Sequence, residues 1–211
     1  MDFEEALSIL RNHNSFTTER ERQQHEILVA AVDNLIEFAV AEEMAMLEEL
    51  PEEVDDSCLM DYEGICERYN LTYAVSENEQ VFFAAKMAAW WMAVSAESII
   101  TYMTQADERV RPWHLSLEGV SYRKSEFPQE LIPPIEWGCR CYLIANGVAA
   151  VRASISVDRC KSMVDPVFRE SLAKGGRIFG DAHRYFQKPL PKYAQAIVKR
   201  LKSRFYGEDN T

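Results

Sequence analysis

The chain has 211 residues, a net charge of −11 and a hydrophobic content of 47%. A chain of this length has room for one large domain or two small ones, and its hydrophobic content excludes a disordered protein. The negative charge argues against non-specific wrapping of DNA as the main activity, because binding to phosphates requires a cationic face. We therefore expect a globular protein with a packed core.

The first third of the chain is predicted to be helical. Apolar residues recur at helical spacing from Thr18 to about Leu50, and Thr18 and Glu21 form the capping-box pattern of a helix start. Asn70 is expected to end the last of these helices. The three helices expected in this part cover residues 1–12, 18–50 and 58–69.

A fourth helix is predicted from Ser76 to about residue 105, directly before a segment rich in proline. Ser76 and Glu79 repeat the capping-box pattern. The window 81–103 is the most apolar of the chain, but two charged residues interrupt it, and a membrane-spanning helix needs about 20 predominantly apolar residues. We therefore expect a buried helix and no contact with a membrane.

The second half of the chain contains a clear signal for β-structure. Asn146-Gly147 suits a type I′ turn, and apolar and polar residues alternate in the segment that follows it. This pattern predicts a β-hairpin over residues 139–157. A short helix with Pro166 in its first turn and Gly175-Gly176 at its end should follow, and then a last helix over residues 192–205.

The predicted elements group into three parts of a mainly helical α+β fold. They are a helical part over residues 1–105, a small motif domain with a β-hairpin over residues 106–187, and a basic C-terminal helix with a tail over residues 188–211. The basic helix carries lysines and arginines opposite an apolar stripe. Such a face could contact DNA, whereas the more common role of a charged run is a solvated surface.

The segment from Asp107 to Cys141 combines prolines and glycines with arginines, tryptophans, a histidine and two cysteines. Proline lacks the backbone N–H and has a fixed φ, so this segment cannot be regular helix or central strand, and side-chain contacts must hold it. Arginine can bind a carboxylate through two parallel hydrogen bonds, which gives a loop a fixed geometry. We expect a carboxylate of Asp107 or Glu108 to pair with Arg109, Arg111 or Arg140, and we expect a small local core from Trp113 and Trp137.

A histidine and two cysteines of this segment suggest a zinc site. Neutral imidazole and thiolate are the usual zinc ligands, and a spacing of two places the sulfurs of Cys139 and Cys141 on one face of a strand. His114 would be the third ligand, and His183 is a further candidate. Two alternatives remain open: a buried thiol pair beside a hydrogen-bonded histidine, and a cysteine nucleophile with His114 as its base.

The cysteines also bear on the compartment. The chain has five of them, an odd number without the dense spacing of a disulfide framework, and its first residues lack the pattern of a signal peptide. We therefore expect a reducing compartment.

The proline-rich segment resembles a known family. It begins with D-x-R-V-R-x-x-H-x-x-L-x-G and ends with P-P-x-x-W-G-C-R-C. In this form it is similar to the head-morphogenesis domain of tailed phages, typified by the phage Mu F protein and the SPP1 minor head protein, over about residues 100–187. The matching residues are Asp107, Arg109, Val110, Arg111, His114, Leu117, Gly119, Pro133, Pro134, Trp137, Gly138, Cys139, Arg140 and Cys141.

A weaker similarity to the same family follows from Asp165 to Phe186. Family members often show the pattern F-x-x-N…G-x-I-F…H-P-Y-Y in this region. Here Ser171 stands in place of the asparagine and Arg184 in place of the proline. This half of the resemblance is therefore less specific than the first.

The resemblance implies a non-enzymatic minor head protein of a phage or prophage. Such a protein would act in head morphogenesis, in the virion or in the host cell cytoplasm, and would contact the portal or the capsid interior. The alternative is a small phage-borne effector enzyme, a nuclease or a cysteine-dependent enzyme, that uses His114, Cys139 and Cys141.

Overall fold

The computed structural model describes residues 2–12, 15–53, 57–146, 159 and 162–207. It forms two compact units. The helical unit comprises Met1–Glu79 and Asp181–Thr211, and the sheet unit comprises Gln80–Gly180. The units are therefore divided at other positions than the predicted boundaries after residues 105 and 187.

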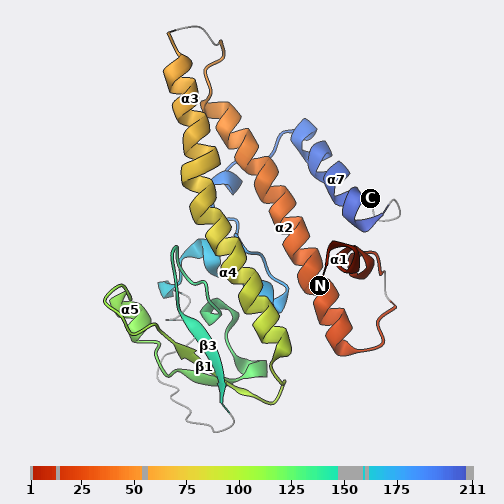
Figure 1. The fold of residues 1–211 in the computed structure, drawn as a ribbon, viewed down its shortest axis with the longest axis vertical. Coiled ribbons are helices and arrows are strands. Elements are labelled where there is room, and N and C mark those ends of the chain that lie inside the picture. The colour runs from red at the N-terminus through yellow and green to blue at the C-terminus, as the bar shows by residue number, and fades with distance from the viewer. Residues whose placement is uncertain (1, 13–14, 54–56, 147–158, 160–161, 208–211) are drawn as a thin grey trace. The chain divides into compact units, whose positions relative to one another are not determined.

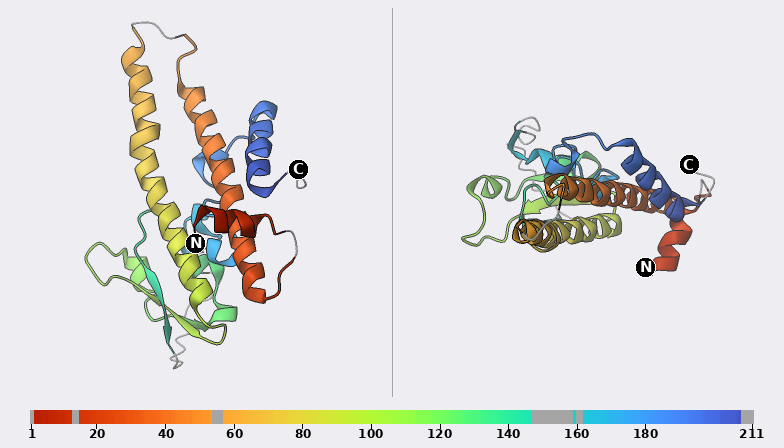
Figure 2. Two further views of the ribbon diagram at one scale, coloured as in Figure 1. Left: turned by 45° about the vertical axis from the view of Figure 1, so that its right-hand side comes forward. Right: turned by 90° about the horizontal axis from the view of Figure 1, so that it is seen from above.

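The helical unit is built around α2, which contacts α1, α3, η6 and α7 (Figures 1 and 2). Lys202 on α7 forms ion pairs with Asp33 and Glu37 on α2, and the Tyr206 hydroxyl donates to the Asp33 carboxylate at 2.8 Å. These contacts fix α7 on α2. The elements are α1 (Phe3–Leu10), α2 (Glu19–Glu49), α3 (Leu59–Glu67), the π-helix η1 (Arg68–Tyr73), the first turns of α4 (Ala74–Ala93), the 3-10 helix η6 (Arg184–Phe186) and α7 (Lys192–Tyr206).

The capping box predicted at the start of α2 is confirmed. The Thr18 hydroxyl accepts a hydrogen bond from the Glu21 backbone N–H at 3.2 Å, and the Glu21 carboxylate accepts one from the Thr18 backbone N–H at 3.3 Å. A helix leaves its first backbone N–H groups without helical partners, and a cap of this kind typically stabilises a helix by about 1 kcal/mol.

α3, η1 and α4 follow one another without a break over residues 59–93. The predicted helix end at Asn70 and the predicted capping box at Ser76 and Glu79 are therefore wrong. Asn70 lies in η1, where its side-chain amide donates to the Cys66 carbonyl at 3.0 Å. Its polar side chain thus satisfies a carbonyl of the preceding turn instead of ending the helix.

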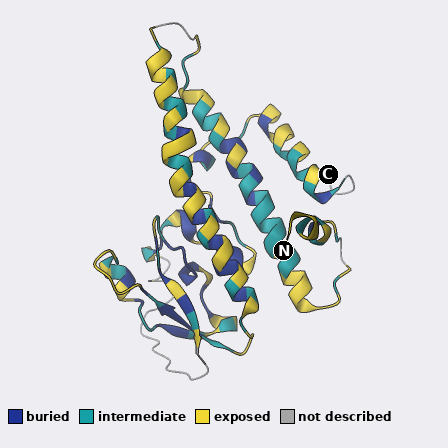
Figure 3. Cartoon of the chain, in the orientation of Figure 1, coloured by how far each residue is buried: buried dark blue, intermediate teal, exposed yellow. Residues whose placement is uncertain are grey.

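The sheet unit contains an antiparallel sheet with the order β2-β1-β3. Its strands are β1 (Ile99–Met103), β2 (Ser121–Arg123) and β3 (Tyr142–Asn146). In the central strand, Ile100 lies opposite Tyr122 of β2 and Ala145 of β3. The middle of β1 is buried, as the dark blue colour in Figure 3 shows.

The prediction of a helix up to residue 105 is wrong beyond Ala93. Residues 99–101 read Ile-Ile-Thr, and β-branched side chains favour a pleated strand over a helix. A buried strand and a buried helix give the same run of apolar residues, so the apolar window could not separate them. Pairing of β1 with a strand on each side decides in favour of the strand.

Short helical turns lie between the strands of the sheet unit or follow β3. They are α5 (Pro112–Leu115), η2 (Lys124–Glu126), η3 (Gln129–Leu131), η4 (Pro166–Phe168) and η5 (Leu172–Lys174). The helix predicted after Pro166 is thus a pair of 3-10 turns, and Gly175 ends the second in the left-handed region with a φ of 75°. Fully buried side chains of the sheet unit include Ile100, Tyr102, Leu117, Phe127, Leu131, Ile135, Phe168 and Phe179.

The predicted mainly helical α+β fold is confirmed. The first strand of the predicted hairpin is β3, and it pairs with β1. The remainder of the hairpin, from Gly147 onward, falls on residues 147–158 and lies outside the described residues. Among the helices that the structure describes, none is both long enough and apolar enough to cross a bilayer.

Candidate functional site

Three of the four predicted zinc ligands lie together in the sheet unit. His114 is on α5, and Cys139 and Cys141 directly precede β3. One donor atom of each side chain lies within 4.8 Å of the other two, and all three residues are buried. His114 Nδ1 is 3.3 Å from Cys141 Sγ. We call these three residues the His–Cys cluster.

Glu136 holds the opposite side of the His114 ring. Its carboxylate accepts hydrogen bonds from His114 Nε2 at 3.1 Å and from Trp113 Nε1 at 3.0 Å, and it pairs with Arg111 Nε at 2.6 Å. An ionised carboxylate only accepts hydrogen bonds, so His114 Nε2 carries the proton. His114 Nδ1 therefore presents its lone pair to the cysteines.

The backbone around the cluster explains how an irregular segment holds these positions. Pro112 occupies the first turn of α5, where its fixed φ suits a helix start. Gly119 follows with a φ of 79°, and its N–H donates to the Tyr102 carbonyl on β1 at 2.9 Å. Gly138, next to Cys139, has a φ of 65°. Residues with a Cβ rarely adopt this left-handed region, so both glycines are required by the turn geometry.

The predicted pairing of Asp107 with an arginine is confirmed for Arg140. Arg140 Nη2 lies 2.7 Å from Asp107 Oδ1, which also accepts the Arg109 backbone N–H at 3.1 Å. The hydrogen bond from Arg140 lowers the pKa of Asp107 below its ordinary value. Water screens this exposed pair, so its main effect is on the geometry of the loop.

Arg111 pairs with Glu136, although the sequence suggested Asp107 or Glu108 as its partner. Arg111 Nη2 also donates to the Trp137 carbonyl at 2.6 Å. A single guanidinium thus links α5 to the residues just before Cys139. This bridge joins the two ends of the proline-rich segment by side-chain contacts, as its irregular backbone requires.

The two tryptophans of the segment pack on different partners. The Trp113 ring lies edge-on to the His114 ring with a centroid distance of 4.1 Å. Trp137 lies 5.1 Å from Phe168 and 5.8 Å from Phe179, again between ring centroids. Pro133 and Pro134, which precede Trp137, are joined by a cis peptide bond and are both buried.

The two cysteines differ in acidity. A hydrogen bond from Cys141 lowers the pKa of Cys139 to about 5 in spite of its burial. Interaction with Cys139 and burial raise the pKa of Cys141 above its ordinary value. The two thiols therefore titrate as a pair, in which loss of the first proton is favoured and loss of the second is opposed.

Tyr102 on β1 brings a fourth polar atom to the cluster. Burial, followed by the charges of Cys139 and Cys141, raises the pKa of Tyr102 well above its ordinary value. Its side chain is fully buried, and none of the described residues offers the hydroxyl a hydrogen-bond partner in good geometry. Desolvation of an unpaired hydroxyl costs free energy, so this atom requires an explanation.

His183, the fourth predicted ligand, belongs to the helical unit. Its ring is buried and packs on Phe38 and Tyr185 with centroid distances of 4.9 and 4.7 Å. Its Nδ1 accepts the Tyr185 backbone N–H at 3.4 Å. Burial, followed by the charge of Arg184, lowers the pKa of His183 to about 4, so the ring is neutral at pH 7. These are the contacts of a core histidine.

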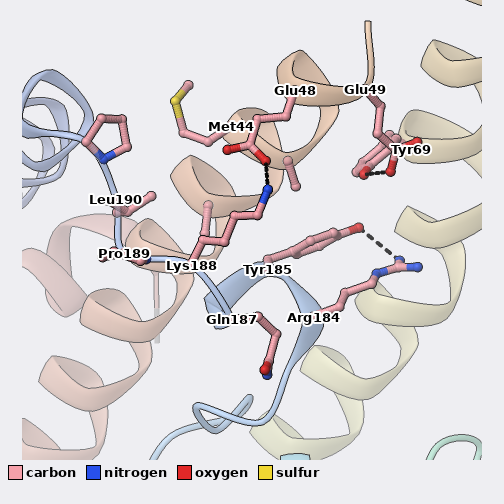
Figure 4. A pocket seen from close by; sticks show the side chains of 13 residues that line it. Met44, Glu48, Glu49, Tyr69, Arg184, Tyr185, Gln187, Lys188, Pro189 and Leu190 are labelled. Carbon is pink, nitrogen blue, oxygen red and sulfur yellow. Dashed lines mark hydrogen bonds and ion pairs between the residues drawn. The ribbon is translucent and has the colours of Figure 1, made fainter.

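The helical unit also contains a cavity of about 340 Å³. Figure 4 shows that polar side chains at its wall face one another: Lys188 pairs with Glu48, and the Tyr69 hydroxyl donates to Glu49. These polar groups are thus bonded to one another. It is lined by Ala41, Met44, Ala45, Glu48, Glu49, Tyr69, Arg184, Tyr185, Gln187, Lys188, Pro189, Leu190 and Pro191.

Sequence reasoning missed two residues of the site, Glu136 and Tyr102. Glu136 lies within the P-P-x-x-W motif, and an acidic residue there could have been weighed beside Asp107 and Glu108 as a partner for arginine. Tyr102 was assigned to a helix, which gave no reason to place it near the cysteines. Its position on β1 depends on long-range strand pairing.

Comparison with known proteins links the site to one family. Residues 45–144 match the family described as phage Mu protein F like protein, which is just under half of the chain. The match contains the His–Cys cluster with Glu136 and Tyr102. It ends before the second predicted pattern at Asp165–Phe186, so that part of the resemblance stays a prediction.

Two curated proteins are similar to parts of the chain. A Mu-like prophage FluMu F protein of Haemophilus influenzae is 34% identical over 73 residues, which are 34% of this chain and 18% of that protein. An uncharacterized protein of Methanocaldococcus jannaschii is 50% identical over 42 residues, which are 20% of this chain and 7% of that protein. The chain thus spans less than a fifth of either relative. No solved structure matches the chain significantly. Over residues 45–144, the chain is thus similar to the phage Mu protein F like proteins.

Proposed function

We propose that the chain is a non-enzymatic minor head protein of a phage or prophage, which acts in head morphogenesis and contacts the portal or the capsid interior. The family match over residues 45–144 carries this proposal. The role implies that the protein is a component of the virion and is made in the host cell cytoplasm.

The packing of the motif supports a structural role. The cavity next to the His–Cys cluster measures about 10 Å³, which is about the space of one water molecule. Cys139 and Cys141 are 5% and 2% exposed. The polar atoms of Arg111, His114 and Glu136 are used in contacts with one another. A site of this kind rigidifies a fold and leaves no space for a substrate.

Loss of the chain should prevent formation of infectious heads in the phage or prophage that encodes it. A deletion strain should yield few infectious particles, and the wild-type chain supplied from a plasmid should restore them. Mass spectrometry of the purified particles should detect the chain. Glu136→Ala, which removes the shared carboxylate of the motif, should fail to restore the yield.

The matched control for this experiment is Glu126→Ala, because Glu126 is an exposed residue of the same unit. It should restore the yield of infectious particles fully. Normal heads without the chain, or particles that lack it, would overturn the proposed role.

The second candidate function is a cysteine-dependent effector enzyme. The lowered pKa of Cys139 favours it, since a thiolate is the nucleophilic form of cysteine. Burial of Cys139 and the small volume beside it argue against it. Deletion distinguishes the two, because heads form without an effector but require a head protein.

We further propose that α7 contacts DNA in the head. Lys202 is used in ion pairs to α2, whereas other cations of this helix are exposed, namely Lys192, Lys199, Arg200 and Arg204. Replacement of all four by glutamine should weaken DNA binding and reduce the slope of log affinity against log salt by up to about 3.6, which is about 0.9 for each phosphate contact. Fluorescence anisotropy with duplex DNA between 50 and 200 mM salt would measure this. An unchanged slope would contradict DNA contact through α7.

A further inference from the structure

The three donor atoms of the His–Cys cluster lie close enough together to bind one metal ion. With zinc–sulfur and zinc–nitrogen distances of about 2.3 and 2.0 Å, two tetrahedral ligand atoms lie about 3.5–3.8 Å apart. The His114 Nδ1 to Cys141 Sγ distance is 3.3 Å, and all three donor atoms are mutually within 4.8 Å. Shifts of about 1 Å or less would place all three around one ion.

The hydroxyl of Tyr102 supplies an independent observation. It is buried beside the side chains of Cys139 and Cys141, but it makes no hydrogen bond of good geometry with any described residue. A buried polar atom without a partner costs free energy unless another group contacts it. An ion between Cys139, Cys141 and His114 would give this oxygen a partner and would complete four donors.

The charges around the cluster suit a divalent cation. Two adjacent buried thiols cannot both ionise easily without a cation, whereas a zinc ion neutralises two thiolates. Arg111 and Arg140 line the same small cavity as His114 and Cys141, so two guanidinium groups stand near this site and favour negatively charged thiolates.

The hydrogen bond of His114 Nε2 is also typical of a histidine that binds zinc. Histidines that bind zinc usually donate their second N–H to a carboxylate or a carbonyl, which fixes the tautomer and orients the ring. His114 Nε2 donates to Glu136, and Glu136 is in turn held by Arg111 and Trp113. The free lone pair is consequently on Nδ1, the atom that faces the thiols.

We propose that Cys139, Cys141, His114 and Tyr102 bind one zinc ion in a closed, structural site. The ligands come from β1, from α5 and from the residues before β3, so the ion would tie both ends of the proline-rich segment to the central strand. Soft thiolates with an imidazole select zinc over the hard cations magnesium and calcium. This inference goes beyond the proposed assembly role and does not depend on it.

The test is the metal content of the full chain, purified with a tag that binds no metal and without chelators. The wild type should contain about one zinc per chain by mass spectrometry of the metal. Cobalt exchanged into the site should show the thiolate charge-transfer band and the visible bands of a tetrahedral ion. Cys141→Ser should contain no zinc. Any cobalt that it binds should show a charge-transfer band that is weaker by the contribution of one thiolate. Cys66→Ser should show neither change, because Cys66 belongs to the helical unit.

Two further measurements keep the proposal falsifiable if Cys141→Ser does not fold. Removal of zinc from the wild type by a chelator should lower its thermal midpoint, and added zinc should restore it. Tyr102→Phe should weaken zinc binding by about 10–100-fold, because loss of a ligand costs at least as much affinity as loss of a residue that supports a ligand. It should also change the cobalt spectrum. Absence of metal from the wild type, or a Cys139–Cys141 disulfide under reducing purification, would overturn the site. An unchanged Tyr102→Phe spectrum would overturn the four-ligand assignment.

Discussion

Glu136→Ala is expected to lower the free energy of unfolding of the sheet unit by about 3 kcal/mol, because three donors would lose one shared acceptor. The His114 side chain is 2% exposed, so its Nε2 would regain little contact with water. Trp113 Nε1 and the Arg111 guanidinium are part-buried and would regain water only in part. The tryptophans of the chain, Trp90, Trp91, Trp113 and Trp137, all lie in the sheet unit, so urea unfolding followed by tryptophan fluorescence reports this unit.

Two further variants serve as references for this decrease in the free energy of unfolding. Glu136→Gln keeps the shape of the side chain and one acceptor oxygen, so it should lose about half as much, about 1.5 kcal/mol. Glu126→Ala removes an exposed carboxylate of the same unit and should change stability by less than about 0.5 kcal/mol. A loss below about 1 kcal/mol for Glu136→Ala would show that Glu136 does not hold the motif together.

Glu42→Gln is expected to stabilise the helical unit at pH 7 and above. Burial, followed by the charge of Glu77, raises the pKa of Glu42 to about 7, and Arg184 offsets only part of this. Glu77 is itself buried with an ion pair to Arg184 at 3.1 Å, and burial also raises its pKa. The negative charges of Glu42 and Glu77 are therefore both near Arg184, whose single positive charge cannot neutralise the two. Glutamine at position 42 removes one of the two negative charges.

The sign of the pH dependence follows from proton linkage. Between pH 4.5 and 7 the folded chain binds more protons at Glu42 than the unfolded chain, so this group lowers stability as the pH rises. His183 acts in the opposite direction between about pH 4 and 6.5, because its pKa is lowered on folding. The informative quantity is hence the difference between variant and wild type, which should grow by on the order of 2 kcal/mol from pH 4.5 to pH 7.

Urea unfolding followed by circular dichroism at several pH values measures this difference. Glu63→Gln is the control, since Glu63 is an exposed carboxylate of α3 in the same unit. Its difference from wild type should stay flat across the range. If the Glu42→Gln difference is equally flat, the two carboxylates do not share a buried environment.

Local signals explain which parts of the fold could be predicted. α2 was placed within one residue at each end, because Thr18 and Glu21 cap its start and Pro51 follows its end. These signals involve neighbours in the sequence. The sequence does not predict β1, because its conformation is decided by pairing with β2 and β3, and the paired residues lie 20 to 47 positions apart along the chain.

The same distinction applies to the site. The residue types and the spacing of Cys139 and Cys141 predicted that a histidine could meet the two thiols, and the structure brings His114 to them. The sequence could not rank Glu136 above Asp107 and Glu108 as the partner of Arg111. That choice depends on how the chain folds back between Gly119 and Pro133, for which no short-range pattern exists.

The order of the units along the chain has a consequence for synthesis on the ribosome. The sheet unit is encoded as one continuous stretch, whereas the helical unit is split between the two ends of the chain. A domain can fold during translation only when all of its segments have emerged. The stretch 80–180 can thus be complete before Lys202 is made, so the contacts of α2 with η6 and α7 form after the sheet unit has all of its residues.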